Sequence, residues 1–215
     1  MIKKIREIVN DIMKEEEKQN NVVFVDASQA AELMPGPEPD MRTIGLFTDV
    51  VEEKIAELIH AMLYLNELNR LEESDENKRP IDFYVSTYGG SADDMFGMYD
   101  TMRQIREETE IHTVGVGKVM SAGVLLLAAG TKGKRKIGKY CRVMIHSVMG
   151  GGHGSLHNLA NEMEAIQRLQ DDYLNALVEE TKMSREEIKN MIERKVNVYL
   201  SAEEAVELGI ADIII

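Results

Sequence analysis

The chain has 215 residues, 44% of them hydrophobic and 29% charged, a composition typical of a globular protein with one substantial core. The formal net charge of -13 at pH 7 repels phosphate backbones and anionic lipid, so neither nucleic acid nor a membrane is an expected partner. The single cysteine, Cys141, excludes a disulfide framework within the chain. Residues 1–18 carry charge throughout and lack the apolar stretch of a signal peptide, so we expect a cytoplasmic protein.

The N-terminal residues differ from the rest of the chain. Apolar positions at helical spacing predict a helix over residues 1–20, and residues 22–26 predict a short strand. Residues 32–40 hold three of the four prolines and predict a loop. We therefore expect an N-terminal helical and loop appendage over residues 1–41 and one main domain over 42–215.

From residue 43 onward, predicted strands and helices alternate. Predicted strands cover 43–50, 80–90, 111–117, 140–147, 196–202 and 210–215. Predicted helices cover 51–68, 91–109, 121–130, 156–181, 184–194 and 202–209. The basic run "KGKRK" at 132–136 predicts a solvated turn. This alternation predicts the α/β class, with repeated β-α-β units and a largely parallel sheet.

Ser121 and His146 are the first candidates for chemistry. Ser121 stands where a strand passes into an apolar helix, and the free N–H groups of a helix N-terminus suit a developing oxyanion. Taken alone, the pattern favours a helix N-cap or a buried small residue over a nucleophile. His146 follows a strand and precedes a glycine cluster, and taken alone it favours a half-buried histidine. The Gly89-Gly90 turn is equally compatible with an oxyanion donor and with a plain tight turn.

A metal site is not expected. His153 and His157 are four residues apart, but no cluster of Cys, Asp or Glu completes a ligand set. We expect surface histidines and no cofactor.

The order and spacing of the motifs say more than any motif alone. From about Arg42 to the C-terminus, the chain resembles the ClpP serine peptidases, the proteolytic subunits of the Clp protease, and the segments "AAGTKGKR", "RVMIH" and "LSAEEAVELGIAD" carry the resemblance. The resemblance implies a crotonase-like α/β core of β-α-β units with a long protruding handle helix at about 156–181. It also implies heptameric rings that stack in pairs, and an AAA+ unfoldase that feeds in unfolded polypeptide. The subunit itself would bind no nucleotide.

The resemblance also assigns roles to residues. The nucleophile falls on Ser121 and the general base on His146, and the oxyanion-hole amides fall on Gly90 and Ala122. The positions that would bind extended substrate are Ser91, Ala92, Val148, Met149, Gly150 and Gly151.

The third position of the triad departs from the family pattern. Asn197 stands where the family has an aspartate. An asparagine orients a histidine through its side-chain oxygen, but it supplies no charge to stabilise an imidazolium. We therefore expect a slow or conditionally active peptidase, unless a carboxylate such as Glu193 substitutes. The pair Lys195-Val196 also replaces the Glu-Arg pair that joins rings in the family.

Two function classes remain in view. The first is a self-compartmentalised serine endopeptidase, which the presence of both Ser121 and His146 favours. The second is a catalytically impaired Clp-like subunit with a structural or regulatory role in a ring, which Asn197 and Lys195-Val196 favour. A crotonase-type acyl-CoA enzyme shares the core and ranks third, because it would not need the serine and the histidine at this separation.

Overall fold

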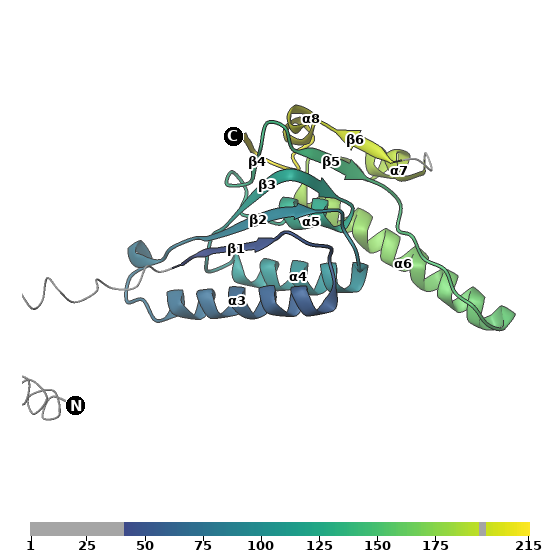
Figure 1. The fold of residues 1–215 in the computed structure, drawn as a ribbon, viewed down its shortest axis with the longest axis horizontal. Helices are drawn as coiled ribbons and strands as arrows, with labels where there is room; N and C mark the ends of the chain where they lie inside the picture. The colour runs from purple at the N-terminus through teal and green to yellow at the C-terminus, as the bar shows by residue number, and fades with distance from the viewer. Residues whose placement is uncertain (1–40, 194–196) are drawn as a thin grey trace, which may run out of the picture. The chain divides into compact units, whose positions relative to one another are not determined.

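The structure is a computed structural model, and it describes residues 41–193 and 197–215 (Figure 1). All of them except Met41 belong to one compact unit, Arg42–Ile215. Apart from Met41, the predicted appendage lies outside the described residues, as does the Lys195-Val196 pair. Within the described ranges, no helix combines the length and the apolar character that crossing a membrane requires.

The described strands form one sheet. They are β1 (Thr43–Leu46), β2 (Ile81–Thr87), β3 (Ile111–Met120), β4 (Lys136–Ile137), β5 (Arg142–Ile145), β6 (Val198–Leu200) and β7 (Ile213–Ile214). The strand order is β1-β2-β3-β4-β7, and β5 pairs with β3 on one side and with β6 on the other. Besides β2, the long strand β3 pairs with two further strands, with β4 in its first half and with β5 at its last residues. All pairings are parallel except β5 with β6, so the predicted α/β class is confirmed.

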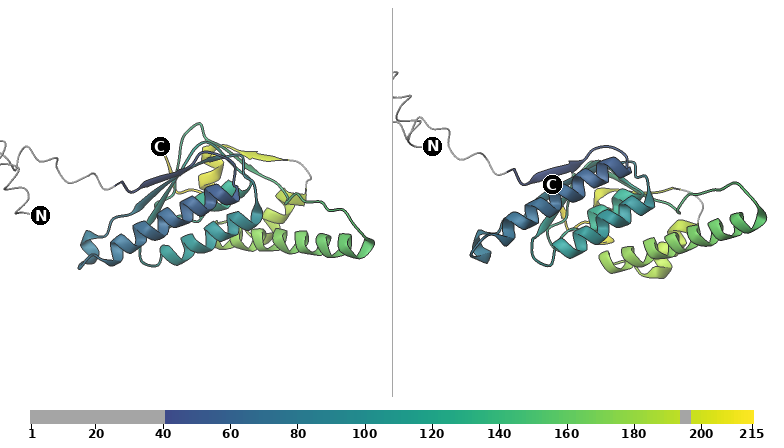
Figure 2. Two further views of the ribbon diagram at one scale, coloured as in Figure 1. Left: turned by 60° about the horizontal axis from the view of Figure 1, so that its bottom comes forward. Right: turned by 90° about the horizontal axis from the view of Figure 1, so that it is seen from below.

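Six helices and one 3-10 turn accompany the sheet in the described part of the chain. They are α3 (Glu52–Arg70), α4 (Ala92–Ile105), α5 (Ala122–Ala128), α6 (Leu156–Glu180), α7 (Arg185–Glu193) and α8 (Ala202–Glu207), with a 3-10 turn η1 at Asp75–Asn77. Figures 1 and 2 show α3 and α4 side by side beneath the sheet. Helix α5 packs against β2 and β3 and touches both α4 and α6.

The core follows from residue patterning. Strand β2 alternates buried and half-buried residues, as expected of a strand with one face on the core. Helix α3 buries apolar residues at helical spacing, among them Ile55, Leu58, Met62 and Leu65. Helix α5 is buried on all sides, because the sheet, α4 and α6 enclose it.

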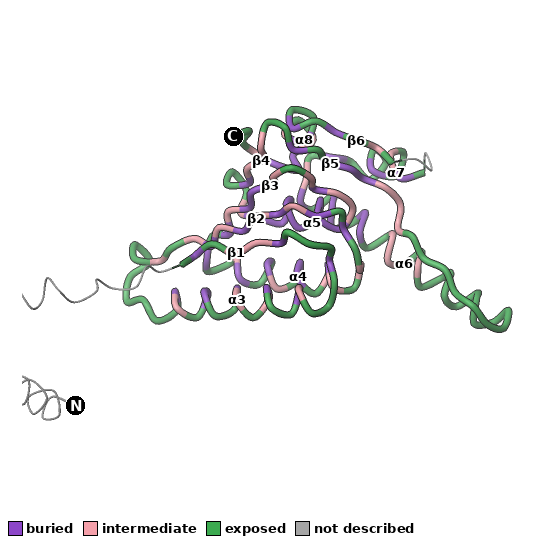
Figure 3. Tube along the Cα trace, in the orientation of Figure 1, coloured by how far each residue is buried: buried purple, intermediate pink, exposed green. Residues whose placement is uncertain are grey.

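Helix α6 is the predicted handle. Its C-terminal part packs on the core and its N-terminal part projects beyond the sheet (Figures 1 and 3). The buried residues of α6, from Tyr173 to Glu180, all lie in the packed part. The projecting part leaves apolar side chains in solvent, with Leu156 80% and Met163 58% exposed.

Several predicted boundaries are wrong. The strand predicted at 43–50 ends at Leu46, the one at 210–215 covers only Ile213–Ile214, and β3 continues three residues beyond 117. The basic run is not a solvated turn throughout. Its last residue begins β4, and Arg135 is buried, because pairing with β3 and β7 draws this segment into the sheet.

Candidate active site

A cavity of about 250 Å³ opens where β2, β3 and β5 end. In parallel sheets, ligand sites form at the carboxyl ends of the strands, where the loops that follow them meet. The cavity is lined by Tyr88, Gly90, Ser91, Ala92, Met95, Ser121, Ala122, His146, Ser147, Val148, Met149 and Tyr173. None of the described residues that line it is Asp, Glu, Lys or Arg, so the surroundings are largely apolar with a few polar groups.

Ser121 has an unusual backbone conformation. Strand β3 ends at Met120 and α5 begins at Ala122, so a single residue makes the turn. Ser121 has φ +53° and ψ −122°, and among the described residues no other non-glycine residue has a positive φ. Such a conformation costs on the order of 1–3 kcal/mol and persists only where the surroundings enforce it.

The Ser121 hydroxyl does not cap helix α5. A serine that caps a helix accepts a hydrogen bond from an amide in the first turn. The side chain of Ser121 makes no such bond, although the residue occupies the N-cap position of α5. The simple capping role that the sequence pattern favoured is therefore absent.

The surroundings hold both backbone groups of Ser121. Its N–H donates to the carbonyl oxygen of Met144 in β5 at 2.8 Å. Its carbonyl oxygen accepts from the Val124 N–H at 3.0 Å and from the Tyr173 hydroxyl at 3.1 Å. Three elements, β5, α5 and α6, thus fix the peptide that carries the serine.

The Gly89-Gly90 turn approaches Ser121 closely. A Cβ on Gly89 would lie 2.5 Å from the Ser121 Cβ, so only glycine fits there. A Cβ on Gly90 would lie 2.2 Å from the carbonyl oxygen of Val50, whose N–H and C=O bond with Gly89 and Ser91. Within the described part of the chain, the N–H of Gly90 makes no hydrogen bond. The Ala122 N–H is likewise open, because the first helical amide has no partner inside its own helix.

His146 and Asn197 each stand one residue beyond the paired part of β5 and β6. The last antiparallel pair is Ile145 with Val198, and continuing this register by one residue would set His146 opposite Asn197. His146 is half-buried and lines the cavity, whereas Asn197 is exposed and outside the lining. The Asn197 amide donates to the Tyr199 hydroxyl at 3.5 Å. Among the described residues, no hydrogen bond joins His146 to Ser121 or to Asn197.

The structure separates the other predicted residues into two groups. Ser91, Ala92, Val148 and Met149 line the cavity together with Gly90 and Ala122. Gly150 and Gly151 lie outside the lining, and a Cβ on Gly150 would meet the Ile166 side chain of α6.

Glu193, the suggested substitute for the missing carboxylate, is not in the cavity. It lies beside Lys189 at 3.6 Å and lines a separate depression between α6 and α7. His153 and His157 are exposed.

Four cavity residues were not predicted to bind substrate: Tyr88, Met95, Ser147 and Tyr173. Tyr173 had a signal, since it belongs to the apolar stripe of the long helix, but the stripe gave no sign that its hydroxyl would reach Ser121.

Burial keeps the Tyr173 hydroxyl protonated. The side chain is only 4% exposed, and desolvation raises the pKa of the phenol far above its usual value. Tyr173 is therefore a neutral donor throughout the physiological pH range.

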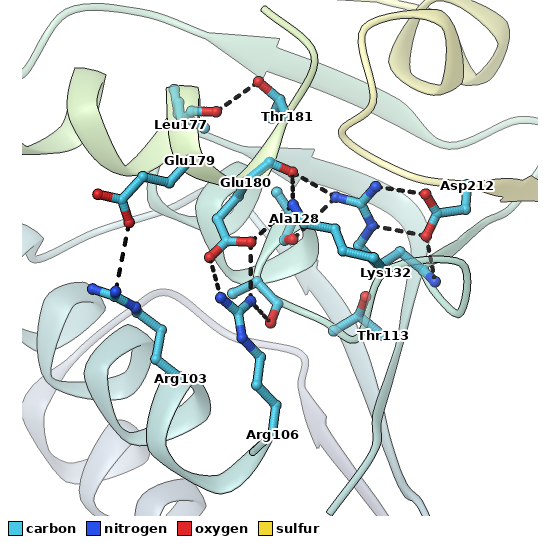
Figure 4. A network of polar contacts seen from close by, with 12 residues as sticks. Arg103, Arg106, Thr113, Ala128, Lys132, Leu177, Glu179, Glu180, Thr181 and Asp212 are labelled. Carbon is cyan, nitrogen blue, oxygen red and sulfur yellow. Dashed lines mark hydrogen bonds and ion pairs between the residues drawn. The ribbon is translucent and has the colours of Figure 1, made fainter.

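A network of partly buried ion pairs anchors the packed end of α6 (Figure 4). Glu180, 1% exposed, bonds with Arg106 at 2.6 Å and with Lys132 at 2.9 Å, and Arg135 binds Asp212 at 2.8 Å. Burial alone would raise the pKa values of both carboxyls. The hydrogen bonds from Arg106 and Lys132 to Glu180, and from Arg135 to Asp212, outweigh burial and lower these pKa values. The network joins α4, the loop before β4 and the C-terminal segment to α6.

The family model of the Clp protease matches residues 39–215. This match covers most of the chain, so the chain belongs to the Clp protease family. Its relatives include "ATP-dependent Clp protease proteolytic subunit 1" of Prochlorococcus marinus subsp. pastoris, 34% identical over 174 residues, which are 81% of this chain and 83% of the relative.

Further relatives carry a related name. "ATP-dependent Clp protease proteolytic subunit 2" of Parasynechococcus marenigrum is 32% identical over 81% of this chain and 83% of its own length. The protein of the same name from Prochlorococcus marinus is 35% identical over 74% of this chain and 73% of its own length. The predicted family is therefore confirmed.

Proposed function

We propose that the chain is a serine endopeptidase subunit of a self-compartmentalised protease that cleaves unfolded polypeptides. The conformation and surroundings of Ser121 carry the proposal. Its hydroxyl caps no amide, its backbone is strained, and it shares a cavity with His146 at the N-terminus of a buried helix. Strain of this kind is expected where the conformation serves function.

In the proposed reaction, His146 accepts the proton of Ser121 as the hydroxyl oxygen attacks the peptide carbonyl carbon. The N–H groups of Gly90 and Ala122 bind the resulting oxyanion. His146 then gives the proton to the leaving amine, which breaks the peptide bond and leaves an acyl group on Ser121. Water, activated by His146, hydrolyses this ester and restores the serine.

Ser121 and His146 line the same cavity, and no hydrogen bond joins them in the described residues. This is compatible with the proposed role, because such bonds in free enzymes often tighten only when substrate binds. Asn197 is the proposed orienting residue, because the β5–β6 register, continued one residue beyond the Ile145–Val198 pair, would set it opposite His146. Its neutral amide would leave the imidazolium without a compensating charge, which makes the proposed activity slow or conditional.

The proposed subunit works in an assembly. Helix α6 projects with Leu156, Leu159 and Met163 exposed, and apolar side chains on a projecting helix suit contact with other subunits. We propose self-association into heptameric rings that stack through α6, an AAA+ unfoldase as partner, and a cytoplasmic location. Light scattering on the purified protein distinguishes one ring from two by particle mass.

Labelling with a fluorophosphonate probe tests the proposed chemistry. We expect labelling of the wild-type assembly, loss of labelling in Ser121→Ala, and retained labelling in the matched control Ser147→Ala. Ser147 lines the same cavity, so the control removes a hydroxyl without removing the nucleophile.

The second candidate is a catalytically impaired Clp-like subunit with a structural or regulatory role in a ring. The exposure of Asn197 and its bond to Tyr199 favour this candidate, since neither feature prepares it to orient His146. Absence of Ser121-dependent labelling in the intact assembly would select the second candidate over the first.

A further inference from the structure

Helix α6 reaches the nucleophile through one side chain. The Tyr173 ring lines the cavity, and its hydroxyl donates to the carbonyl oxygen of Ser121 at 3.1 Å. The phenol is buried and has no other hydrogen-bond partner among the described residues. This contact lies outside the proposed nucleophile, base and oxyanion donors, yet it touches the peptide that joins Ser121 to Ala122.

Because the Ser121–Ala122 peptide is planar, the bond from Tyr173 to the Ser121 carbonyl oxygen also affects the Ala122 N–H. In a trans peptide, the C=O of one residue and the N–H of the next point in opposite directions. When Val124 and Tyr173 hold the Ser121 carbonyl, they also hold the direction of the Ala122 N–H. The Ala122 amide is one of the two proposed oxyanion donors. Such a donor stabilises the oxyanion most when its N–H direction is fixed before the reaction.

The rest of α6 keeps the Tyr173 hydroxyl in place. Glu180 follows Tyr173 by seven residues, which is about two helical turns, so both side chains lie on the same face of α6. Arg106 and Lys132 bind Glu180 in the network of Figure 4 and fix this end of the helix against the core. The donor therefore stands on a rigid support.

We propose that Tyr173 is a positioning residue, whose hydroxyl fixes the Ser121–Ala122 peptide so that the Ala122 N–H is directed at the oxyanion. The proposal rests on the proposed peptidase function for its catalytic part. Its structural part, the restraint of the peptide, stands independently of activity.

Tyr173→Phe tests the proposal because it removes only the hydroxyl. We expect kcat for a fluorogenic peptide to fall about tenfold with KM changed less than twofold, a smaller loss than the ~100-fold or more for complete removal of an oxyanion donor. We also expect faster hydrogen–deuterium exchange in the peptic fragment covering 119–125, which contains the hydrogen-bonded amides of Ser121 and Val124.

The matched control is Tyr99→Phe. Tyr99 is another buried tyrosine, and its hydroxyl bonds to Glu180 at 3.0 Å, away from Ser121. Arg106 and Lys132 still hold Glu180 in this variant, so kcat and the exchange of 119–125 stay at wild-type values.

Three results overturn the proposal: unchanged kcat in Tyr173→Phe, unchanged exchange in 119–125, or the same changes in Tyr99→Phe. A wild-type protein without Ser121-dependent labelling is a different result. It refutes the proposed peptidase, while the exchange comparison still decides whether Tyr173 restrains the peptide.

Discussion

Replacing the Asn197 amide by a carboxylate probes the third position of the site. The β5–β6 pairing ends at Ile145 and Val198, and continuing its register by one residue would set residue 197 opposite His146. Cβ atoms of directly opposed residues are about 4.5–5.5 Å apart, so we expect the Asn197→Asp side chain to come within reach of the imidazole. We expect it to raise the peptidase rate, because a carboxylate stabilises the imidazolium that forms when Ser121 loses its proton.

The exposure of residue 197 sets the size of the effect. Two unit charges about 4 Å apart interact by about 1 kcal/mol in water and about 4 kcal/mol at the effective dielectric near a protein surface. Asn197 is exposed and outside the cavity lining, so the lower figure applies to the free protein. Since 1.4 kcal/mol is tenfold, 1 kcal/mol is about fivefold in kcat. Substrate that excludes water from His146 would increase the gain.

The assay is kcat for a fluorogenic peptide at one pH and fixed assembly state. The matched control is Asn190→Asp, which adds the same charge to an exposed position of α7. An unchanged or lower rate in Asn197→Asp would show that the missing charge is not what limits the reaction. An equal rise in Asn190→Asp would attribute the effect to net charge instead.

Other consequences follow from the packing. Gly89→Ala sets a Cβ 2.5 Å from the Ser121 Cβ, so we expect Ser121 labelling to fall at least about tenfold while circular dichroism shows a retained fold. Hydrogen bonds from cations outweigh burial and lower the pKa values of Glu180 and Asp212. The stability that these two ionised carboxylates give the fold is complete above about pH 4.5 and is lost as pH falls through their folded-state pKa values. We therefore expect the melting temperature to fall over this range of pH. Burial raises the pKa of Cys141 to about 11 from 9.0, so alkylation at pH 8 is about 100-fold slower than in urea.

The sequence predicts the elements whose patterns are local. Helix α3 repeats apolar residues at helical spacing over its full length, and β2 alternates, so neighbouring residues alone define both. Ser201 and Glu204 likewise form a capping box that starts α8 within four residues of chain. These features need no information from distant segments.

The features that the sequence misses depend on distant partners. Strand β4 begins at the last residue of the basic run, and only its pairing with β3 and β7 makes it a strand. Arg135 is buried because Asp212 and the Glu180 carbonyl oxygen meet it there, although both lie far along the chain. The positive φ of Ser121 has the same origin, because β5, α5 and α6 enforce it together.

The site divides into a part that is fixed before the reaction and a part that is not. β5, α5 and α6 hold the half-buried Ser121 and its peptide, whereas Asn197 stands in solvent just before β6. In the proposed mechanism, oxyanion binding depends on the first part, and orientation of His146 depends on the second. In serine proteases, the oxyanion hole and substrate binding alone retain about 10³–10⁴-fold catalysis when triad members are removed. A fluorophosphonate carries a better leaving group than an amide, so it demands less of His146, and we expect it to react with Ser121 faster than an amide substrate turns over. The informative quantity is the rate of phosphonylation divided by the rate of peptide turnover. If Asn197→Asp lowers this ratio below the wild-type value and Tyr173→Phe does not, the slow step depends on the exposed half of the site.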